Sequence, residues 1–414
     1  MTLPQTLPGA HRGHQQRIQH RQSAHVCMAG QASSRARGAA APRAAQQPRR
    51  AAPSSAAPPM CGAPAAHWQP LGRGPRPRGH HQPRAADPAP AAAAAAAAEP
   101  GRQREGGGAR GAGGAGPQGF VLEAPEVQRL LRERGCSMDV LLLSLLEPAA
   151  RLARPPISNY HVGAVGLAPS GRVYLGANLE FPGAPLSQSV HAEQFLMASL
   201  LLAREAGLDT LAISAAPCGH CRQFYSELAC ADSVRFLFGS HDAPHEAEEY
   251  TLADLLPARF GPIDLIEPGS APLLLEPQAN RLAWAPPAAR RLEERAGEAP
   301  FARAAAAALE AAKRSYSPYT RCPAGVALVA RGGRVFSGGY TENAAHNPGL
   351  APLQAAVVGA IIGGLGPYSE IEEVVVAELG AGLVRHGGVA KTVARAATGN
   401  AMLPVTVLHT QWTE

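Results

Sequence analysis

The sequence contains the same short segment twice. Gly171-Arg172-Val173-Tyr174-Leu175-Gly176 recurs 162 positions later as Gly333-Arg334-Val335-Phe336-Ser337-Gly338, and Glu180 falls on Glu342 at the same offset. An internal repeat restricts the folds that are open to a chain, because both copies have to fit one architecture. The repeat therefore predicts a single kind of domain that occurs twice, on either side of a linker around Pro286-Pro287.

Apolar spacing predicts the first elements of the first domain. Helical periodicity begins near Phe120 and ends at Arg154-Pro155-Pro156, because proline is incompatible with a continuing helix. Two short apolar segments, 162–167 and 173–175, flank the turn residues Pro169-Ser170-Gly171 and predict a β-hairpin.

The next segments complete the domain. A helix is expected from about Ser189 to a C-terminal cap at Gly207, followed by a strand over 210–214. Pro217 is expected to open a further helix, and 234–238 should form another strand. A sheet with helices on both faces follows from this order, so the predicted fold is a duplicated three-layer α/β/α sandwich of the α/β class.

Charge divides the chain into two unlike regions. Residues 1–117 hold 15 Arg and no Lys against three acidic residues, whereas 118–414 hold 23 Arg and Lys against 29 acidic residues. The first region is rich in Ala, Pro, Ser and Gly, so it has too few large apolar side chains to offset its ordering entropy. We expect three parts: a disordered extension over 1–117, a first domain over 118–280 and its copy over 290–412.

The extension leaves the localisation open. Its Arg-rich, acid-poor composition is typical of chloroplast and mitochondrial transit peptides, but a plain low-complexity extension or a wrongly chosen start codon gives the same composition. We expect a cytoplasmic protein, with chloroplast or mitochondrion as the alternative. No apolar stretch reaches the length of a membrane span, and seven cysteines are too few and of the wrong parity for a disulfide framework.

Two motifs of the first domain indicate its chemistry, His191-Ala192-Glu193 and Pro217-Cys218-Gly219-His220-Cys221. One imidazole and two thiolates supply three zinc ligands and leave the fourth tetrahedral position open for water. A carboxylate beside the imidazole can move protons. The pattern H-x-E followed by P-C-x-x-C is the signature of zinc-dependent nucleobase deaminases. We therefore predict one zinc ion per chain, bound by His191, Cys218 and Cys221, with Glu193 as the catalytic proton carrier.

Both motifs are expected at helix N-termini. Residues two apart on a regular helix point roughly 200° apart, so His191 and Glu193 can face one pocket only where a helix begins. Cys218 and Cys221 suit one face of a helical turn. The positive end of a helix dipole favours thiolate over thiol, which is the form that binds zinc.

The same residues have two alternative uses in proteins, a structural zinc site and a redox pair. A structural zinc site needs a fourth protein ligand, but His220 points in a different helical direction from the cysteines and Cys230 is expected in the core. A glutamate at the open position would also serve no purpose in a closed site. A redox pair of cysteines would leave His191 and Glu193 unexplained.

The second copy lacks this chemistry. The stretch expected to hold His-Ala-Glu reads Pro352-Leu353-Gln354, and no Cys-x-x-Cys follows in the second half. We therefore expect the copy to keep the fold without the metal.

Four segments of the chain carry a family resemblance. They are Ser158-Asn159-Tyr160-His161-Val162-Gly163-Ala164-Val165, Gly176-Ala177-Asn178-Leu179-Glu180-Phe181, His191-Ala192-Glu193-Gln194 and Ala216-Pro217-Cys218-Gly219-His220-Cys221-Arg222-Gln223-Phe224. Together they resemble cytidine deaminase, specifically the long, two-domain, homodimeric kind found in plants and some bacteria. The resemblance covers roughly residues 118 to 410.

The resemblance implies a function and further site residues. It implies zinc-dependent hydrolysis of cytidine and 2′-deoxycytidine to uridine and 2′-deoxyuridine with release of ammonia, by a homodimer that acts on free nucleosides. Asn178 and Glu180 would bind the ribose hydroxyl, Tyr160 would pack against the pyrimidine, and the Ala192 N–H would lie near the base carbonyl. Cys322 stands at the copy's equivalent of Tyr160, so a nucleoside pocket should be missing there.

Two other functions were considered beside this one. A deaminase that edits cytosine in RNA or DNA would need basic and stacking aromatic residues around the site, whereas the folded region is acidic and the whole chain has two lysines. We therefore expect no nucleic-acid partner and no membrane partner. A catalytically dead relative is disfavoured because all three ligands and Glu193 are present.

Overall fold

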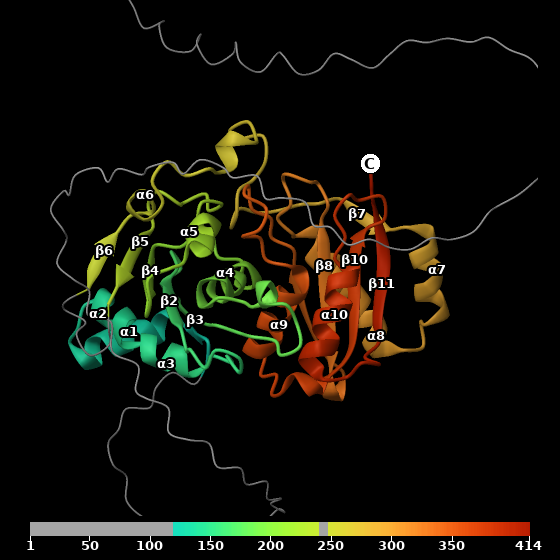
Figure 1. Ribbon diagram of the computed structural model, residues 1–414, viewed down its shortest axis with the longest axis horizontal. Helices are drawn as coiled ribbons and strands as arrows, with labels where there is room; N and C mark the ends of the chain where they lie inside the picture. The colour runs from blue at the N-terminus through green and yellow to red at the C-terminus, as the bar shows by residue number, and fades with distance from the viewer. Residues whose placement is uncertain (1–118, 240–246) are drawn as a thin grey trace, which may run out of the picture. The chain divides into compact units, whose positions relative to one another are not determined.

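The computed structural model describes residues 119–239 and 247–414, which contain two β-sheets. The predicted disordered extension over 1–117 lies outside these residues. The first sheet has the strand order β1-β3-β2-β4-β5-β6 and the second has the order β7-β11-β10-β8-β9 (Figure 1). Within the described residues, no helix has the length and apolar character that crossing a membrane requires.

The first sheet is built around the predicted hairpin, β2 and β3. These two strands are antiparallel, β2 also pairs with β4 in antiparallel fashion, and β4 pairs with β5 in parallel. Its strands are β1 (Val121–Leu122), β2 (Gly163–Leu167), β3 (Val173–Ala177), β4 (Thr210–Ile213), β5 (Arg235–Phe238) and β6 (Glu248–Tyr250).

The second sheet repeats this arrangement. The order β3-β2-β4-β5 returns as β9-β8-β10-β11, again with one parallel pair, β10 with β11. The duplication predicted from the sequence is therefore confirmed. The strands are β7 (Leu282–Trp284), β8 (Ala324–Ala330), β9 (Arg334–Gly339), β10 (Ile371–Leu379) and β11 (Val405–Trp412).

Helices cover both faces of each sheet, as the predicted three-layer sandwich requires. In the first domain, α1 to α3 form one apolar cluster with the sheet, and α4 and α5 pack on the opposite face. The helices are α1 (Ala124–Arg134), α2 (Met138–Ser144), α3 (Leu146–Arg151), α4 (Ala192–Ala203), α5 (Gly219–Tyr225) and α6 (Leu252–Leu255).

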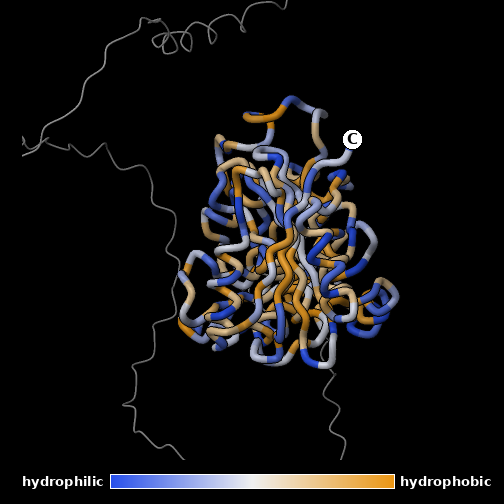
Figure 2. Tube along the Cα trace, turned by 90° about the vertical axis from the view of Figure 1, so that its right-hand side faces the viewer, coloured by the Kyte–Doolittle hydropathy of each residue, from blue (hydrophilic) through white to orange (hydrophobic). Residues whose placement is uncertain are grey.

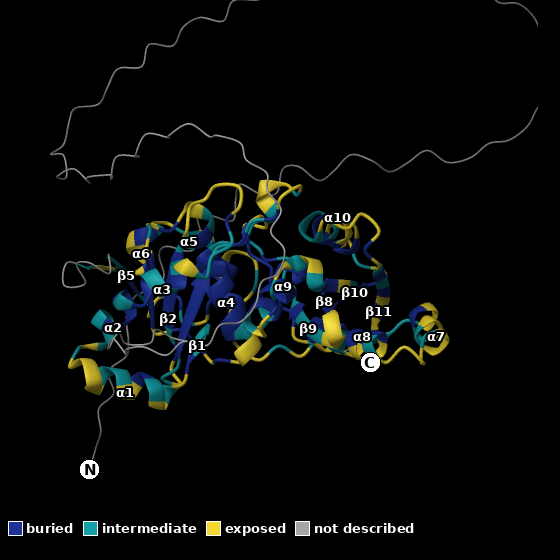
Figure 3. Ribbon diagram, turned by 90° about the horizontal axis from the view of Figure 1, so that it is seen from below, coloured by how far each residue is buried: buried dark blue, intermediate teal, exposed yellow. Residues whose placement is uncertain are grey.

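In the second domain, α7 and α8 cover the outer face, and α9 and α10 cover the face towards the first domain. Helices α4 and α9 pack against each other, so one continuous core spans both domains. Figure 2 shows the hydrophobic residues gathered in the central segments, and Figure 3 shows exposed residues along α1 and α7. The helices are α7 (Pro286–Glu294), α8 (Ala299–Lys313), α9 (Pro352–Ile362) and α10 (Gly387–Thr398).

Glycines of the repeat explain why the sheets and helices can approach closely. A Cβ atom on Gly176 would lie 2.2 Å from the Ala192 carbonyl oxygen, at the start of α4. At the equivalent place in the copy, a Cβ on Gly338 would lie 2.2 Å from the Ala356 nitrogen of α9. Both distances are far below van der Waals contact, so each position excludes any side chain.

Several predicted boundaries were wrong. The helical segment after Phe120 is a short strand and three helices, and α4 begins after His191 rather than near Ser189. It ends at Ala203, and Arg204 rather than Gly207 adopts the left-handed conformation, with φ of 57°. Pro217 does not lie in the first turn of α5, because the N-cap is Cys218.

The alignment of the two halves shifts by two residues after the hairpin. Leu179 exchanges two backbone hydrogen bonds with Val190, and Thr341 exchanges the same two with Leu350. His191 is the N-cap of α4, and Ala351 is the N-cap of α9. The copy's counterpart of His-Ala-Glu is therefore Ala351-Pro352-Leu353, one residue earlier than predicted, and Gln354 corresponds to Gln194.

Candidate metal centre and active site

The three predicted metal ligands lie together at the starts of two helices. The ligand atoms of His191, Cys218 and Cys221 all lie within 4.8 Å of one another, and no other such group occurs among the described residues. The His191 Nδ1 atom is 3.5 Å from the Cys218 Sγ and 3.4 Å from the Cys221 Sγ. An imidazole and a thiolate bound to one tetrahedral zinc ion are separated by about 3.6 Å, so the donor set fits zinc.

Helix termini determine this placement, as the sequence predicted. His191 is the N-cap of α4 and Cys218 is the N-cap of α5, both with extended backbone. The first N–H groups of a helix have no intrahelical partner and carry partial positive charge. Both helices therefore direct that charge towards the ligands, where it stabilises thiolate.

The ligands influence one another's protonation. Hydrogen bonds from Cys221 and from His191 lower the pKa of the Cys218 thiol to about 3. The same contact with Cys218 raises the pKa of His191. Cys218 is therefore a thiolate at neutral pH even before a metal contributes its charge, which prepares the site for a cation.

Glu193 lies beside the ligands in the first turn of α4. Only 4% of its surface is exposed, and burial raises the pKa of its carboxyl group. The Cys221 side chain contacts this carboxyl group, and the hydroxyl of Tyr225, which is buried without a partner among the described residues, is close enough to interact with it. A raised pKa suits a group that has to hold and release a proton near neutral pH.

Asn178 and Glu180 hold the loop that carries Tyr160. The Asn178 side chain accepts a hydrogen bond from the Val162 N–H and donates one to the Tyr160 carbonyl, both of 2.9 Å. The Glu180 carboxylate accepts hydrogen bonds of 2.8 and 2.9 Å from the N–H groups of Ile157 and Ser158. Burial raises the pKa of Glu180, but these hydrogen bonds outweigh it and lower the pKa overall.

The β-bridge between Leu179 and Val190 brings this loop to the metal centre. Leu179 pairs with Val190, the residue before His191. Asn178 and Glu180 flank Leu179 in the chain, so both lie near the start of α4. The Tyr160 side chain is 62% exposed, and Ala192 is fully buried as the first residue of α4.

The copy contacts the metal-bearing helices through residues for which the sequence predicted no contact between the domains. The His220 ring, which lies between the two cysteines, makes a 3.0 Å hydrogen bond with the Asn347 carbonyl. The Gln194 amide donates to the Pro348 carbonyl, and the equivalent Gln354 amide donates to the Gln188 carbonyl, each over 3.3 Å. The two halves therefore bind each other reciprocally.

A buried carboxylate provides a second link between the domains. Glu227, just after α5, accepts hydrogen bonds from the hydroxyls of Tyr316 and Tyr319 and from the Ala344 N–H, over 2.5 to 2.7 Å. Its side chain is fully buried, and burial raises its pKa. The sequence could not predict that Glu227 links the two domains, because all three donors lie about 90 or more residues further along the chain.

A cavity of about 770 Å³ opens beside the metal ligands. One wall includes residues 186–189, His191 and Gln194, and the other includes Ala345 and residues 347–351 of the copy. The copy is therefore part of the wall of the cavity that His191 lines.

The corresponding interior of the copy is filled. Cys322, at the position of Tyr160, is 3% exposed, and the ring of Tyr340, at the position of Asn178, lies 4.2 Å from the ring of His386. His386 is the residue before α10, the counterpart of α5. Aromatic packing thus occupies the places of Cys218 and Asn178 in the copy.

Comparison with known proteins agrees with this geometry. Two family models, both described as the cytidine and deoxycytidylate deaminase zinc-binding region, match residues 137–237 and 252–391. The chain is 42% identical over 275 residues to cytidine deaminase 1 of Arabidopsis thaliana, covering 64% of this chain and 90% of that protein. It is 43% identical over 248 residues to cytidine deaminase 6 of the same plant, covering 58% and 81%.

Among solved structures, a cytidine deaminase from Burkholderia pseudomallei has 27% sequence identity and a TM-score of 0.27, covering 29% of this chain and 97% of that chain. The coverage and identity to the plant proteins place this chain in the cytidine deaminase family. It has two deaminase domains, and the zinc site of His191, Cys218 and Cys221 lies in the first.

Proposed function

We propose that the first domain hydrolyses the amino group of free cytidine and 2′-deoxycytidine, giving uridine or 2′-deoxyuridine and ammonia. The observation that carries this proposal is the buried Glu193 carboxyl group beside three ligands with the spacing of a tetrahedral zinc site. Three protein ligands leave one position for water, which distinguishes a catalytic site from a structural one.

Glu193 is the proton carrier in this proposal. Zinc, when bound, supplies a Lewis acid that lowers the pKa of water to about 7. A carboxylate oxygen of Glu193 takes a proton from the attacking water and delivers it to the ring nitrogen next to the attacked carbon. The water oxygen bonds to that carbon as a hydroxyl group. Glu193 then takes the proton of this hydroxyl group and gives it to the amino group, so that the carbon–oxygen double bond forms as the carbon–nitrogen bond breaks and ammonia leaves.

The nucleoside is positioned by the loop and by the start of α4. Asn178 and Glu180 bind the ribose hydroxyl, and each retains hydrogen-bonding capacity beyond the loop contacts described above. The Ala192 N–H, the first of α4 and therefore without an intrahelical partner, faces the base carbonyl. The exposed Tyr160 ring packs against the pyrimidine.

Replacing Glu193 by Ala tests the proton-carrier role. Because Glu193 is not a ligand, zinc should stay bound at one ion per chain, while kcat falls by at least about 10² to 10⁴-fold. Cys218→Ala is the matched comparison, since it should lose the metal itself. Near-normal turnover by the zinc-loaded Glu193→Ala protein would overturn this role.

An ammonia-release assay distinguishes a free nucleoside substrate from a polymer substrate. We expect ammonia release from free cytidine and none from a cytosine-bearing oligonucleotide, because the part of the chain from 118 onward is acidic. Turnover of the oligonucleotide alone would contradict the proposal and favour an editing enzyme.

We further propose that the protein is a homodimer, with the catalytic domain over 118–280 and its copy over 290–412, the latter completed by β7. Large apolar side chains around the site are left exposed, at 45%, 62% and 68% for Ile157, Tyr160 and Leu186, and a second chain would cover them. Sedimentation of the zinc-loaded protein measures this state. For localisation we propose the cytoplasm, and the mass of the mature N-terminus distinguishes it from an organelle.

A further inference from the structure

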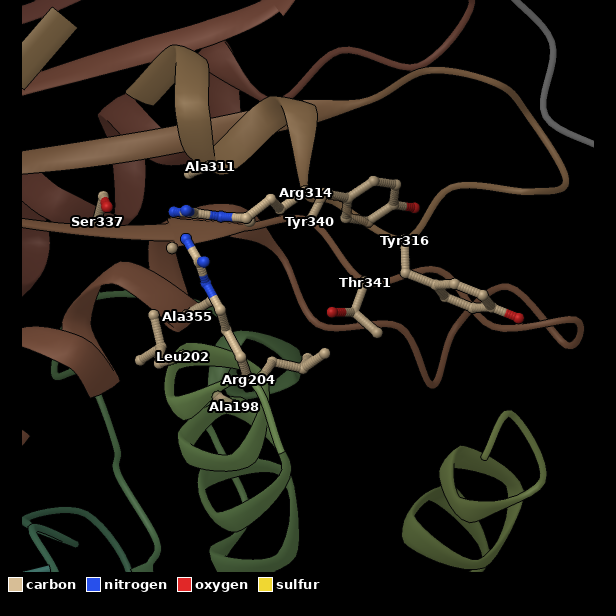
Figure 4. Close-up of a pocket in the computed structure, with 13 residues that line it drawn as sticks. Ala198, Leu202, Arg204, Ala311, Arg314, Tyr316, Ser337, Tyr340, Thr341 and Ala355 are labelled. Carbon is tan, nitrogen blue, oxygen red and sulfur yellow. The ribbon is translucent and has the colours of Figure 1, made fainter. Parts of the chain in front are cut away.

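A cavity separate from the metal centre lies at the end of α4 opposite His191. It has a volume of about 250 Å³ and is lined by residues of α4, α8, β9 and α9 and of the segments between them. Two of the lining residues are arginines, Arg204 and Arg314, and none is acidic. Figure 4 shows their guanidinium groups pointing towards each other, one from α4 and one from the end of α8. Both arginines are exposed, so water screens their mutual repulsion, and an anion bound between them would neutralise it further.

The carboxylates nearest in sequence are engaged elsewhere. Glu205, next to Arg204, accepts hydrogen bonds from the hydroxyls of Ser170 and Tyr174 on the other side of α4. Glu310, one turn before Arg314, pairs with Lys313. Neither arginine forms an ion pair with a residue that the structure describes, so the two charges share no protein counter-ion there.

The backbone conformation of Arg204 indicates that the arginine side chain has a function at this position. Arg204 has φ of 57°, a left-handed conformation in which glycine is favoured over other residues by about 1 kcal/mol. The equivalent residue after α9 is Gly364, with φ of 81°, and the hydrogen bonds that follow the two helices match. The same bend is therefore made by glycine in the copy and by arginine here.

Arg314 gives the same contrast. It ends α8 with a hydrogen bond from its N–H to the Ala311 carbonyl, and its counterpart after α3, Leu152, makes the equivalent bond to Ala149. The ends of α3 and α9 are thus the equivalents of the ends of α8 and α4. They carry Leu152 and Gly364 in place of the two arginines. Capping a helix C-terminus does not require the charges, because the related helices end without them.

We propose that Arg204 and Arg314 bind the phosphate group of a small phosphorylated molecule in this cavity. A guanidinium group offers paired N–H donors that match phosphate oxygens, and two of them neutralise a phosphate dianion. The hydroxyl groups of Ser337 and Thr341 also line the cavity and add donors. Cavities that hold drug-sized ligands are about 300 to 1,000 Å³, so this smaller one suits a phosphate ion or a sugar phosphate.

Calorimetric titration of the full-length, zinc-loaded protein tests the site, with inorganic phosphate and ribose 5-phosphate as the two probes. Arg204→Gly and Arg314→Leu introduce the residue types found at the equivalent helix ends, Gly364 and Leu152, so the fold should tolerate both substitutions. Each should weaken binding about tenfold or more, and the double variant should abolish it. Arg290→Gln, which removes an exposed arginine on α7, is the matched control and should bind as the wild type does.

The two probes identify the source of the phosphate. Tighter binding of ribose 5-phosphate assigns the site to sugar phosphates, and equal binding assigns it to phosphate itself. Melting temperature separates binding from a structural role, because Arg204→Gly relieves backbone strain and should melt no lower than the wild type. Absence of saturable binding at millimolar phosphate, or equal binding by the arginine variants and the wild type, would overturn the proposal.

Discussion

Glu180 and Glu342 make the same pair of hydrogen bonds in the two halves of the chain. Glu180 accepts from the N–H groups of Ile157 and Ser158, and Glu342 accepts from those of Tyr319 and Thr320. The donors are related by the same 162-residue offset as the carboxylates. A loop anchor was thus kept in both domains, although only the first retains the metal centre.

Substitutions of Glu180 and Glu342 distinguish loop anchoring from substrate binding. We expect Glu180→Ala to lower kcat/KM for cytidine by about 10 to 100-fold, because it loses charge-assisted hydrogen bonds to the loop and, under the proposed function, to the nucleoside. Glu342→Ala should instead lower the free energy of unfolding by about 2 kcal/mol, because two partly buried N–H groups lose the acceptor that the buried Glu342 provides, and leave KM unchanged. Steady-state kinetics and urea denaturation measure the two effects, and a large KM change in Glu342→Ala would contradict this division.

Two glycines give a second matched pair. Alanine at Gly176 or Gly338 would force Cβ to within 2.2 Å of helix backbone, so each variant should lose about 1 to 3 kcal/mol of stability or more. Only Gly176→Ala displaces the start of α4, so it alone should weaken zinc binding in a chelator competition.

The control for the glycine pair is Gly388→Ala in α10, where no atom lies within 4 Å of the added Cβ. Alanine there should raise the stability by about 0.5 to 1 kcal/mol. Equal zinc affinity of Gly176→Ala and the wild type would contradict the predicted displacement of α4.

The buried Glu227 should make stability depend on pH. Burial raises its folded-state pKa above the unfolded value of about 4.3, so the native protein retains a proton that the unfolded chain releases. The stability that this proton contributes is present below the unfolded pKa and is lost as the pH rises through the folded pKa.

Glu227→Gln tests that dependence. The glutamine is uncharged at every pH, so the stability of the variant relative to the wild type should increase across this pH window. Denaturant unfolding at a series of pH values gives the comparison. Tyr319→Phe keeps the carboxyl group and should keep the dependence, and parallel curves for Glu227→Gln and the wild type would show that Glu227 does not titrate there.

Removal of zinc should loosen the contact between the starts of α4 and α5. A bound zinc ion would hold His191 on one helix and the two cysteines on the other more firmly than the contacts of 3.4 and 3.5 Å between them, so a chelator should lower the melting temperature by about 5 °C or more. Added zinc should restore it, and Cys218→Ala should melt at the chelated temperature with or without zinc. An unchanged melting temperature in the chelated wild type would indicate that the helices are held by the surrounding core alone.

Local patterns in the sequence predicted much of the fold. The hairpin of β2 and β3, the strands β4 and β5 and the placement of His191 and Cys218 at helix starts follow from short-range periodicity and spacing, which the structure preserves. The end of α4 did not follow, because Arg204 adopts the conformation that favours glycine. Which residue takes this conformation depends on the surroundings of its side chain in the folded protein, and the local sequence does not indicate these surroundings.

Contacts between the domains were beyond prediction for a related reason. Glu227 has no feature in the sequence that sets it apart, and in the sequence His220 stands out only as a possible zinc ligand and Gln194 only as part of the resemblance. The partners of these three residues become neighbours only when α4 packs against α9. The copy's counterpart of His-Ala-Glu was also misplaced by one residue, because the connection after β9 is two residues shorter than the one after β3 and sequence similarity is too weak there to show it.

The packing of α4 against α9 has a consequence for how the enzyme responds to dilution. The copy supplies one wall of the cavity beside the metal ligands, and it is joined to the first domain by a continuous chain. Such a connection keeps the effective concentration of that wall in about the millimolar range, whatever the concentration of the protein. A separate subunit in the same position would dissociate as the enzyme became scarce, whereas this wall of the cavity stays in place within a single molecule.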